Sequence, residues 1–201
     1  MTTALLLIDI QNDFLPGGAL AVADGDQVIA VANDLLDSYE LVIATQDWHP
    51  ALHQSFASQH PGYEPGQVID FDGLDQVLWP DHCVQESVGS AFASGLDPRA
   101  IERVVRKGTD PTIDSYSGFF DNARRKATTL HELLRTEGAD AVHIMGLATD
   151  YCVLFTALDA VDLGFATTVI ARGCRAVELE AGDGEAAFER MRAAGVEVRT
   201  D

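Results

Sequence analysis

Three residues whose side chains could carry covalent catalysis lie at the ends of predicted buried strands. Asp9 closes the apolar run Leu5–Ile8, and Lys107 closes a short strand that begins near Val104. Cys152 lies in the first turn of a predicted helix, where free backbone N–H groups and the helix dipole stabilise a thiolate and offer donors to an oxyanion. The three predict a base, a cation and a nucleophile. Taken singly, each also fits a structural role, as a capping carboxylate, a solvated lysine or a small buried cysteine.

A second group has the residue types of a metal site. Asp47 and His49 are two residues apart after a predicted strand, so they share one face of an extended chain. His82 lies in the segment Trp79–Cys83, and two imidazoles with one carboxylate give a divalent ion three ligands and open positions for water or substrate. His53 either completes this set or holds a metal-bound water, and the sequence does not choose between the two.

Short apolar runs alternate with longer amphipathic segments along most of the chain. The runs predict strands buried on both faces at Ala4–Ile10, Leu41–Thr45, Val104–Arg106, Ala141–Met145 and Thr167–Ile170. Helical spacing predicts helices at Asp26–Ser38, Asn122–Glu137, Asp150–Leu163 and Gly184–Ala194. The alternation predicts an α/β fold with three α/β/α layers and a mostly parallel central sheet, in which ligands bind beyond the carboxyl ends of the strands.

One region interrupts this alternation. From about residue 48 to residue 97 the chain is rich in Pro, Gly, His and aromatic residues, has no clear periodicity and holds four of the six histidines. Loops of this length in a compact domain usually build functional sites or are disordered, and we expect this one to build the site. With no linker or internal repeat elsewhere, residues 1–201 are expected to form a single domain.

Charge and composition exclude several classes of function. The chain has 13 basic and 32 acidic residues and a net charge of −19, which repels nucleic-acid phosphates and anionic lipids. The longest apolar run, Ala4 to Ile8, is far shorter than a membrane span, and the N-terminus lacks the basic region of a signal peptide. Cys83, Cys152 and Cys174 cannot all pair, so at least one thiol is available for chemistry. Together, these features lead us to expect a cytoplasmic protein that acts on a small molecule rather than on nucleic acid or a membrane.

Five segments together resemble the nicotinamidase (pyrazinamidase) branch of the isochorismatase-like cysteine hydrolases. They are Ile8-Asp9-Ile10-Gln11-Asn12-Asp13-Phe14, Asp47-Trp48-His49-Pro50, Trp79-Pro80-Asp81-His82-Cys83, Arg106-Lys107-Gly108 and Gly146-Leu147-Ala148-Thr149-Asp150-Tyr151-Cys152-Val153. Their order and spacing match the family from about Leu5 to Ala176. The second and third segments are typical of the metal-dependent nicotinamidase branch.

The resemblance implies the isochorismatase-like hydrolase fold and a set of roles for individual residues. It implies a catalytic triad of Asp9, Lys107 and Cys152, an oxyanion hole at the N–H groups of Ala148 and Cys152, and a non-proline cis peptide near Leu147-Ala148. It implies metal ligands Asp47, His49 and His82, and a pocket walled by Phe14, Trp79 and Tyr116. Tyr151, beside the nucleophile, and Gly118–Asp121 vary within the family; we expect Tyr151 to contact substrate, and substrate breadth stays open.

The function expected from this resemblance is metal-dependent hydrolysis of nicotinamide, and also of pyrazinamide, to the acid and ammonia through a thioester. The cofactor is one divalent ion, with zinc the first expectation and iron or manganese also compatible with the ligands. A homo-oligomer is compatible with the sequence but not indicated by it.

Three alternatives remain at this point. The same fold and triad could hydrolyse another small amide, such as a carbamoyl or ureido compound. The Asp/His/His set could instead belong to a non-haem iron oxygenase, which would not need Cys152. A catalytically inactive binding module is the third, and the intact triad argues against it. Cys83 and Cys174 are expected to be structural.

Overall fold

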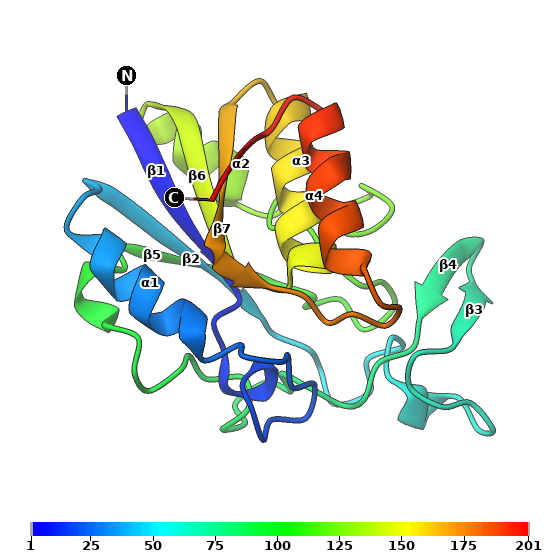
Figure 1. The fold of residues 1–201 in the computed structure, drawn as a ribbon. Coiled ribbons are helices and arrows are strands. Elements are labelled where there is room, and N and C mark those ends of the chain that lie inside the picture. Colours follow the sequence, from blue (N-terminus) through cyan, green and yellow to red (C-terminus); the bar gives the residue numbers. More distant parts are fainter. Residues whose placement is uncertain (1, 201) are drawn as a thin grey trace.

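A parallel sheet forms the centre of the molecule. The computed structural model describes residues 2–200, and within them six strands lie in the order β5-β2-β1-β6-β7-β8, all neighbours parallel (Figure 1). Their bounds are β1 Thr2–Ile8, β2 Leu41–Asp47, β5 Arg103–Lys107, β6 Ala139–Leu147, β7 Ala166–Arg175 and β8 Glu197–Arg199. β1 lies in the middle, and its residues Ala4 to Ile8 are completely buried, as expected for a strand covered on both faces.

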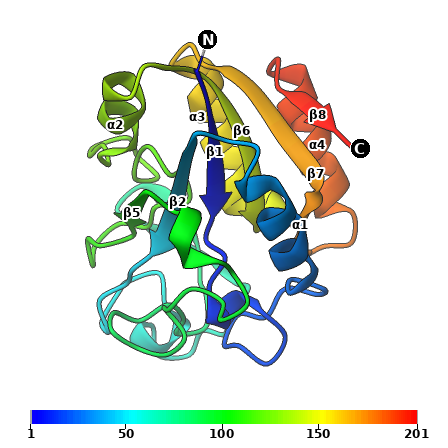
Figure 2. The same ribbon diagram turned by 90° about the vertical axis from the view of Figure 1, so that its left-hand side faces the viewer.

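Helices cover both faces of this sheet, which confirms the predicted three-layer α/β architecture. The helices are α1 Gln27–Leu36, α2 Leu130–Thr136, α3 Leu154–Asp162 and α4 Asp183–Ala193. α1 lies on the opposite face from α3 and α4 (Figures 1 and 2). Right-handed crossovers explain why these helices lie on opposite faces. α1 connects β1 to β2, toward one edge of the sheet, whereas α3 connects β6 to β7 and α4 connects β7 to β8, toward the other edge.

The direction of the connections reverses between β1 and β6. Neighbouring strands whose connections leave to opposite sides open a crevice at their carboxyl ends, where α/β proteins bind ligands. Gly146 near the end of β6 permits the close approach of these strands. Its φ is +129°, and a Cβ there would lie 2.1 Å from the Ile8 carbonyl oxygen.

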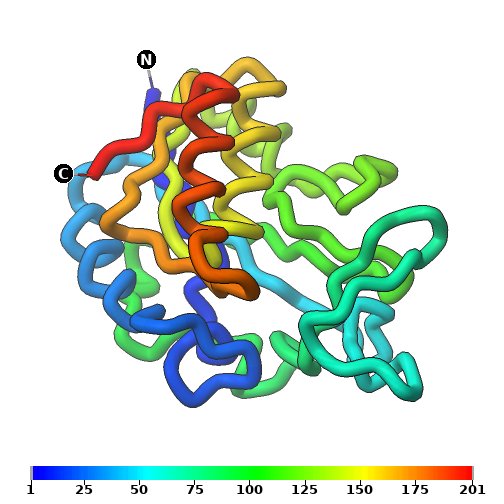
Figure 3. The backbone as a smooth tube through the Cα atoms, turned by 45° about the vertical axis from the view of Figure 1, so that its right-hand side comes forward, coloured from blue at the N-terminus to red at the C-terminus, as the bar shows by residue number. Residues whose placement is uncertain are grey.

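The region between β2 and β5 contributes little regular structure, as predicted. It contains the short 3₁₀ turns Ala57–Gln59 and Pro98–Ala100 and a hairpin of β3 Val68–Phe71 and β4 Leu74–Val77. The hairpin was not predicted from the sequence. The hairpin projects from the body of the molecule (Figure 3). The rest of the segment runs beneath the carboxyl ends of the strands, so it supplies residues to the crevice (Figure 1).

Some predicted bounds are wrong. The helix predicted over Asn122–Glu137 forms only as α2, because the chain before it pairs with the preceding segment through Asn122 N–H to Asp114 O (2.8 Å) and Thr128 N–H to Phe119 O (2.8 Å). The first strand ends at Ile8 rather than Ile10 because the backbone of Asp9, the next residue, turns into the left-handed region. The polar edge strand β8 was not predicted.

None of the helices within residues 2–200 combines the length and apolar character that crossing a membrane requires.

Candidate active site

The side chains of Asp9, Lys107 and Cys152 meet at the carboxyl ends of β1, β5 and β6. Lys107 Nζ lies 2.9 Å from Asp9 Oδ2 and donates to Cys152 Sγ at 3.4 Å. A carboxylate oxygen of Asp9 and the Cys152 sulfur lie within 4.8 Å of each other. The fold therefore brings together the three residues predicted to act as base, cation and nucleophile.

Asp9 occupies a strained and enclosed position. Its φ is +48°, and its carboxylate Oδ1 accepts a hydrogen bond from the Thr45 hydroxyl at 2.7 Å. Burial raises the pKa of the Asp9 carboxyl group above its ordinary value, although the Lys107 ammonium opposes the shift. Asp9 is thus a stronger base than an exposed aspartate.

Lys107 is a fully buried cation held between two carboxylates. Besides its bond to Cys152, Nζ donates to Asp47 Oδ1 at 2.5 Å and to the Ser115 carbonyl oxygen at 2.9 Å, and it forms an ion pair with Asp9. Although burial disfavours the charge, Asp47 and Asp9 hold the pKa of Lys107 well above its ordinary value. Burial also opposes charge on Asp47, but Lys107 and His49 hold the pKa of Asp47 well below its ordinary value. This pair is therefore ionised.

Cys152 lies in a π-helical turn, Thr149–Val153, that directly precedes α3. The peptide bond between Leu147 and Ala148 is cis, as the resemblance implied. Burial outweighs the Lys107 ammonium and raises the pKa of the Cys152 thiol well above its ordinary value. The Cys152 thiol is therefore protonated at rest and needs a base to remove its proton. Asp9, whose pKa is also raised, is the carboxylate beside it.

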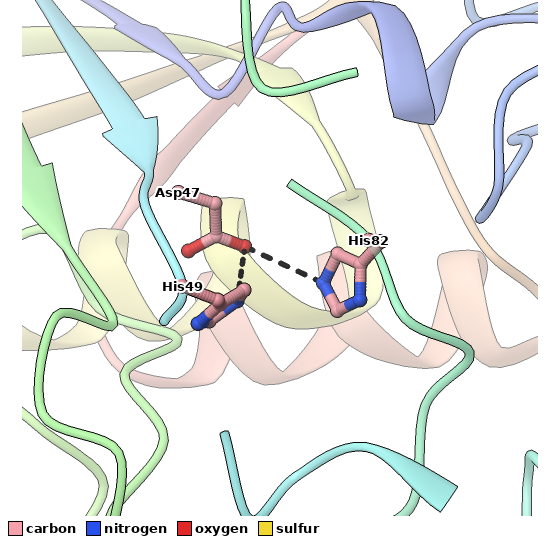
Figure 4. A group of neighbouring side chains, drawn as sticks. All are labelled: Asp47, His49 and His82. Carbon is pink, nitrogen blue, oxygen red and sulfur yellow. Dashed lines mark ion pairs between the residues drawn. The ribbon is translucent and has the colours of Figure 1, made fainter. Parts of the chain in front are cut away.

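Asp47, His49 and His82 converge beside this cluster (Figure 4). Asp47 Oδ2 lies 3.4 Å from His49 Nε2 and 3.8 Å from His82 Nε2. The Nδ1 atoms face backbone carbonyl oxygens, at 2.9 Å for His49 and Gly108 and at 2.8 Å for His82 and Pro80. Since a carbonyl only accepts, each Nδ1 donates, and each Nε2 is left facing Asp47 as the ring atom available to a metal ion.

The donor set fits a divalent metal ion. His49 Nε2 is buried without a hydrogen-bond partner among the described residues, and an unsatisfied buried nitrogen is costly unless it has a ligand. One carboxylate oxygen and two imidazole nitrogens within 4.8 Å of one another supply three ligands.

Gly108 sets the position of His49. Its φ is +63°, and a Cβ there would lie 2.4 Å from His49 Cε1. Only glycine therefore lets the backbone pass behind the imidazole and offer the carbonyl that fixes it.

His53 lies beside His49, with ring centroids 4.4 Å apart. Its Nδ1 lies 2.7 Å from Ser55 Oγ, whereas its Nε2 is buried without a hydrogen-bond partner among residues 2–200. Burial, reinforced by His49, lowers the pKa of His53 to about 4, so the ring is neutral near pH 7. Asp114, His49 and His53 also place one ligand atom each within 4.8 Å.

A pocket joins two of the predicted metal ligands, Asp47 and His82, to the predicted nucleophile. It is lined by Phe14, Leu20, Asp47, Trp79, His82, Asp114, Tyr116, Ala148, Tyr151, Cys152 and Val177. Trp79 packs edge-on against Tyr151 with centroids 4.8 Å apart, and its indole N–H donates to the Tyr116 hydroxyl at 3.2 Å. Three of the four aromatic residues expected to contact substrate, Trp79, Tyr116 and Tyr151, therefore pack against one another as one wall, and Phe14 lines the same pocket.

Several residues of the site were not identified from the sequence. Gln11 accepts from the Asp47 N–H and donates to the Asp47 carbonyl, both at 2.8 Å, so it clamps the backbone of that residue. Thr45, within β2, donates to Asp9 Oδ1, whereas Asp114, Leu20 and Val177 reach the pocket from irregular loops. Thr45 had a signal, a polar side chain in the apolar run that begins at Leu41, whereas Gln11 and the loop residues had none.

Comparison with known proteins agrees with this geometry. Residues 3–201 match the family model "Isochorismatase domain". The chain is 53% identical to the nicotinamidase of Escherichia coli over 98% of this chain and 94% of that protein. It superposes on the nicotinamidase/pyrazinamidase structure from Acinetobacter baumannii with a TM-score of 0.95 and 43% identity, covering 98% of this chain and 95% of the other. For the zinc complex of the Pyrococcus horikoshii pyrazinamidase the TM-score is 0.80 and the identity 34%, over the full length of both chains.

Proposed function

This chain belongs to the isochorismatase family, and we propose that it is a nicotinamidase, which hydrolyses nicotinamide, and also pyrazinamide, to the carboxylic acid and ammonia. One observation carries the proposal: Cys152 lines the same aromatic-walled pocket as Asp47 and His82, two of the three proposed metal ligands. The overall identity to nicotinamidases supports the same conclusion. The three cysteines are free and buried, which supports a reducing, cytoplasmic location.

Asp47, His49 and His82 would hold one divalent ion, which supplies an electrophilic centre for a ring nitrogen of the substrate. Zinc is the metal we propose, with support from the zinc complex of the Pyrococcus pyrazinamidase. His53 is proposed to support this site from behind His49.

The aromatic wall of Trp79, Tyr116 and Tyr151, with Phe14 in the same pocket, is proposed to hold the flat ring. Orienting the ring places its carboxamide next to Cys152. Because the two reacting groups are then held together, less entropy is lost in reaching the transition state.

In the first half-reaction, Asp9 removes the proton from the Cys152 thiol, and the sulfur adds to the carboxamide carbon. The N–H groups of Ala148 and Cys152 are proposed to stabilise the oxyanion of the tetrahedral intermediate. Asp9 then returns the proton to the nitrogen as the C–N bond breaks. Ammonia leaves, and a thioester on Cys152 remains.

In the second half-reaction, Asp9 takes a proton from water, whose oxygen adds to the thioester carbon. Collapse of the intermediate breaks the C–S bond, releases the carboxylic acid and returns the proton to Cys152. The fixed ammonium of Lys107 holds Asp9 beside the sulfur and stabilises negative charge on either.

A substrate panel tests the proposed specificity. Ammonia release is measured with nicotinamide, pyrazinamide and small carbamoyl and ureido amides. The kcat/KM for nicotinamide should be about a hundredfold above that of the non-aromatic amides, because only an aromatic ring can pack against the aromatic wall. A higher kcat/KM for a carbamoyl or ureido compound would contradict the proposal and favour the same chemistry on that substrate.

A further inference from the structure

The segment that follows β7 runs beside the turn that carries the nucleophile. The last residues of β7 and β6 are paired, Cys174 with Gly146 and Arg175 with Leu147. Because the strands are parallel, the chain beyond Arg175 continues alongside residues 148–150.

Asp150 binds this segment directly. It lies in the turn of Cys152 and is 8% exposed, and its two carboxylate oxygens accept from the N–H groups of Val177 (3.0 Å) and Glu178 (2.9 Å). Charge-assisted hydrogen bonds of this kind are about twice as strong as neutral ones. The carboxylate therefore fixes two successive peptide groups relative to the nucleophile.

Glu178 anchors the other end of the same segment. Its φ is +57°, and its carboxylate accepts from the N–H groups of Gly182 (2.7 Å) and Gly184 (3.0 Å) at the start of α4. The backbone is therefore held at Val177 and Glu178 by Asp150, and the chain that follows is tied by Glu178 to the start of α4.

Val177 lines the pocket, and its side chain is half-buried there. This side chain has no group that could take part in the reaction. A β-branched side chain on a fixed backbone is stiff, so it does not yield to a bulkier ligand.

We infer that Asp150 is a positioning residue that fixes Val177 as a specificity-determining wall of the pocket and limits the ring substituents that fit. The inference deepens the proposed function and rests on it for the identity of the substrate. Asp150 acts through the backbone of its neighbours and does not take part in proton transfer.

The specificity role is tested with nicotinamide and its methyl derivatives, the methyl group placed at each open ring carbon in turn. Val177→Ala should raise the ratio of kcat/KM for at least one derivative to that for nicotinamide by about tenfold, the usual effect of room for one methyl group. Val161→Ala, a half-buried valine of α3 outside the pocket, should leave every ratio unchanged. Unchanged ratios in Val177→Ala would overturn the assignment.

The positioning role is tested with Asp150→Asn, which keeps the shape but loses one acceptor. The amides of Val177 and Glu178 should exchange hydrogen faster than in the wild type, and KM for nicotinamide should rise by about tenfold with kcat within about threefold. The control Asp183→Asn removes a similar bond, to the Glu180 N–H at 2.9 Å, and should spare both amides. Unchanged exchange at Val177 and Glu178, or a fall in kcat without a rise in KM, would overturn the role.

The two hypotheses fail separately. A wild-type protein that releases no ammonia from nicotinamide overturns the proposed function and the specificity role of Val177. The exchange rates are measured without substrate, so they still decide whether Asp150 holds the segment.

Discussion

At the residue scale, Asp47 links the two halves of the site. One oxygen pairs with Lys107 at 2.5 Å and the other faces His49 and His82. The sequence placed this aspartate in the metal group and the lysine in the catalytic group, and nothing in their spacing indicated that they touch. A contact across 60 residues depends on the order of β2 and β5 in the sheet, which local patterns do not fix.

Replacing Lys107 with Met should be strongly destabilising. The substitution leaves Asp9 and Asp47 buried without their cation, and breaking a buried ion pair from one side typically costs about 3–5 kcal/mol. Urea unfolding measures the change in free energy, and turnover should be lost as well. The exposed Lys126→Met is the control, within about 0.5 kcal/mol of the wild type. Wild-type stability in Lys107→Met would contradict the ion-pair geometry.

The pH dependence of kcat/KM should report Asp9. Asp9 must be ionised to accept a proton, so activity falls as the pH decreases through its pKa, which burial raises above 3.8. The Thr45 hydroxyl lowers that pKa, and Thr45→Val should therefore move the acid limb to higher pH. Thr168→Val, a buried threonine of β7, should leave the limb in place. A shift to lower pH in Thr45→Val would contradict the role of Asp9 as the base.

At the element scale, the strands that carry the site were predictable because they are short, apolar and buried on both faces. The predicted helix began eight residues before α2 because Asn122–Thr129 has helical spacing but pairs with residues 114–121 instead. The hairpin β3–β4 and the edge strand β8 were missed because strands of three or four residues are too short to give a clear pattern. The pocket residues Leu20 and Val177 were missed for a related reason, since loops carry no periodicity.

Gly108, at the end of β5, allows a test of how an element positions a ligand. Gly108→Ala should weaken metal binding by about 10–100-fold, because its Cβ would displace His49 and disturb the carbonyl that orients it. Competition with a chelating dye measures the affinity. Gly138→Ala shares the left-handed backbone, with φ +70°, but its Cβ meets open space, so metal affinity should be unchanged. Equal affinities in the two variants would show that Gly108 does not position His49.

At the scale of the whole molecule, the charge of −19 distinguishes substrate from product. Nicotinamide is neutral, whereas nicotinate is an anion that the surface repels. Raising the salt concentration from about 0.05 to 0.5 M shortens the Debye length from about 14 to 4 Å. We expect kcat/KM for nicotinamide to change less than about twofold, while the inhibition constant of nicotinate falls. Product inhibition that weakens with salt would contradict this assignment of the surface charge.

The measurement that tests the central claim most directly is ammonia release from nicotinamide by three preparations: the metal-loaded wild type, the same protein after chelation and metal readdition, and metal-loaded Cys152→Ala. We expect turnover in the first, loss on chelation with recovery on readdition, and none in the variant, although the variant should still bind metal and nicotinamide. Undiminished turnover in Cys152→Ala would contradict a cysteine-dependent amidohydrolase, and undiminished turnover after complete metal removal would contradict the role of Asp47, His49 and His82.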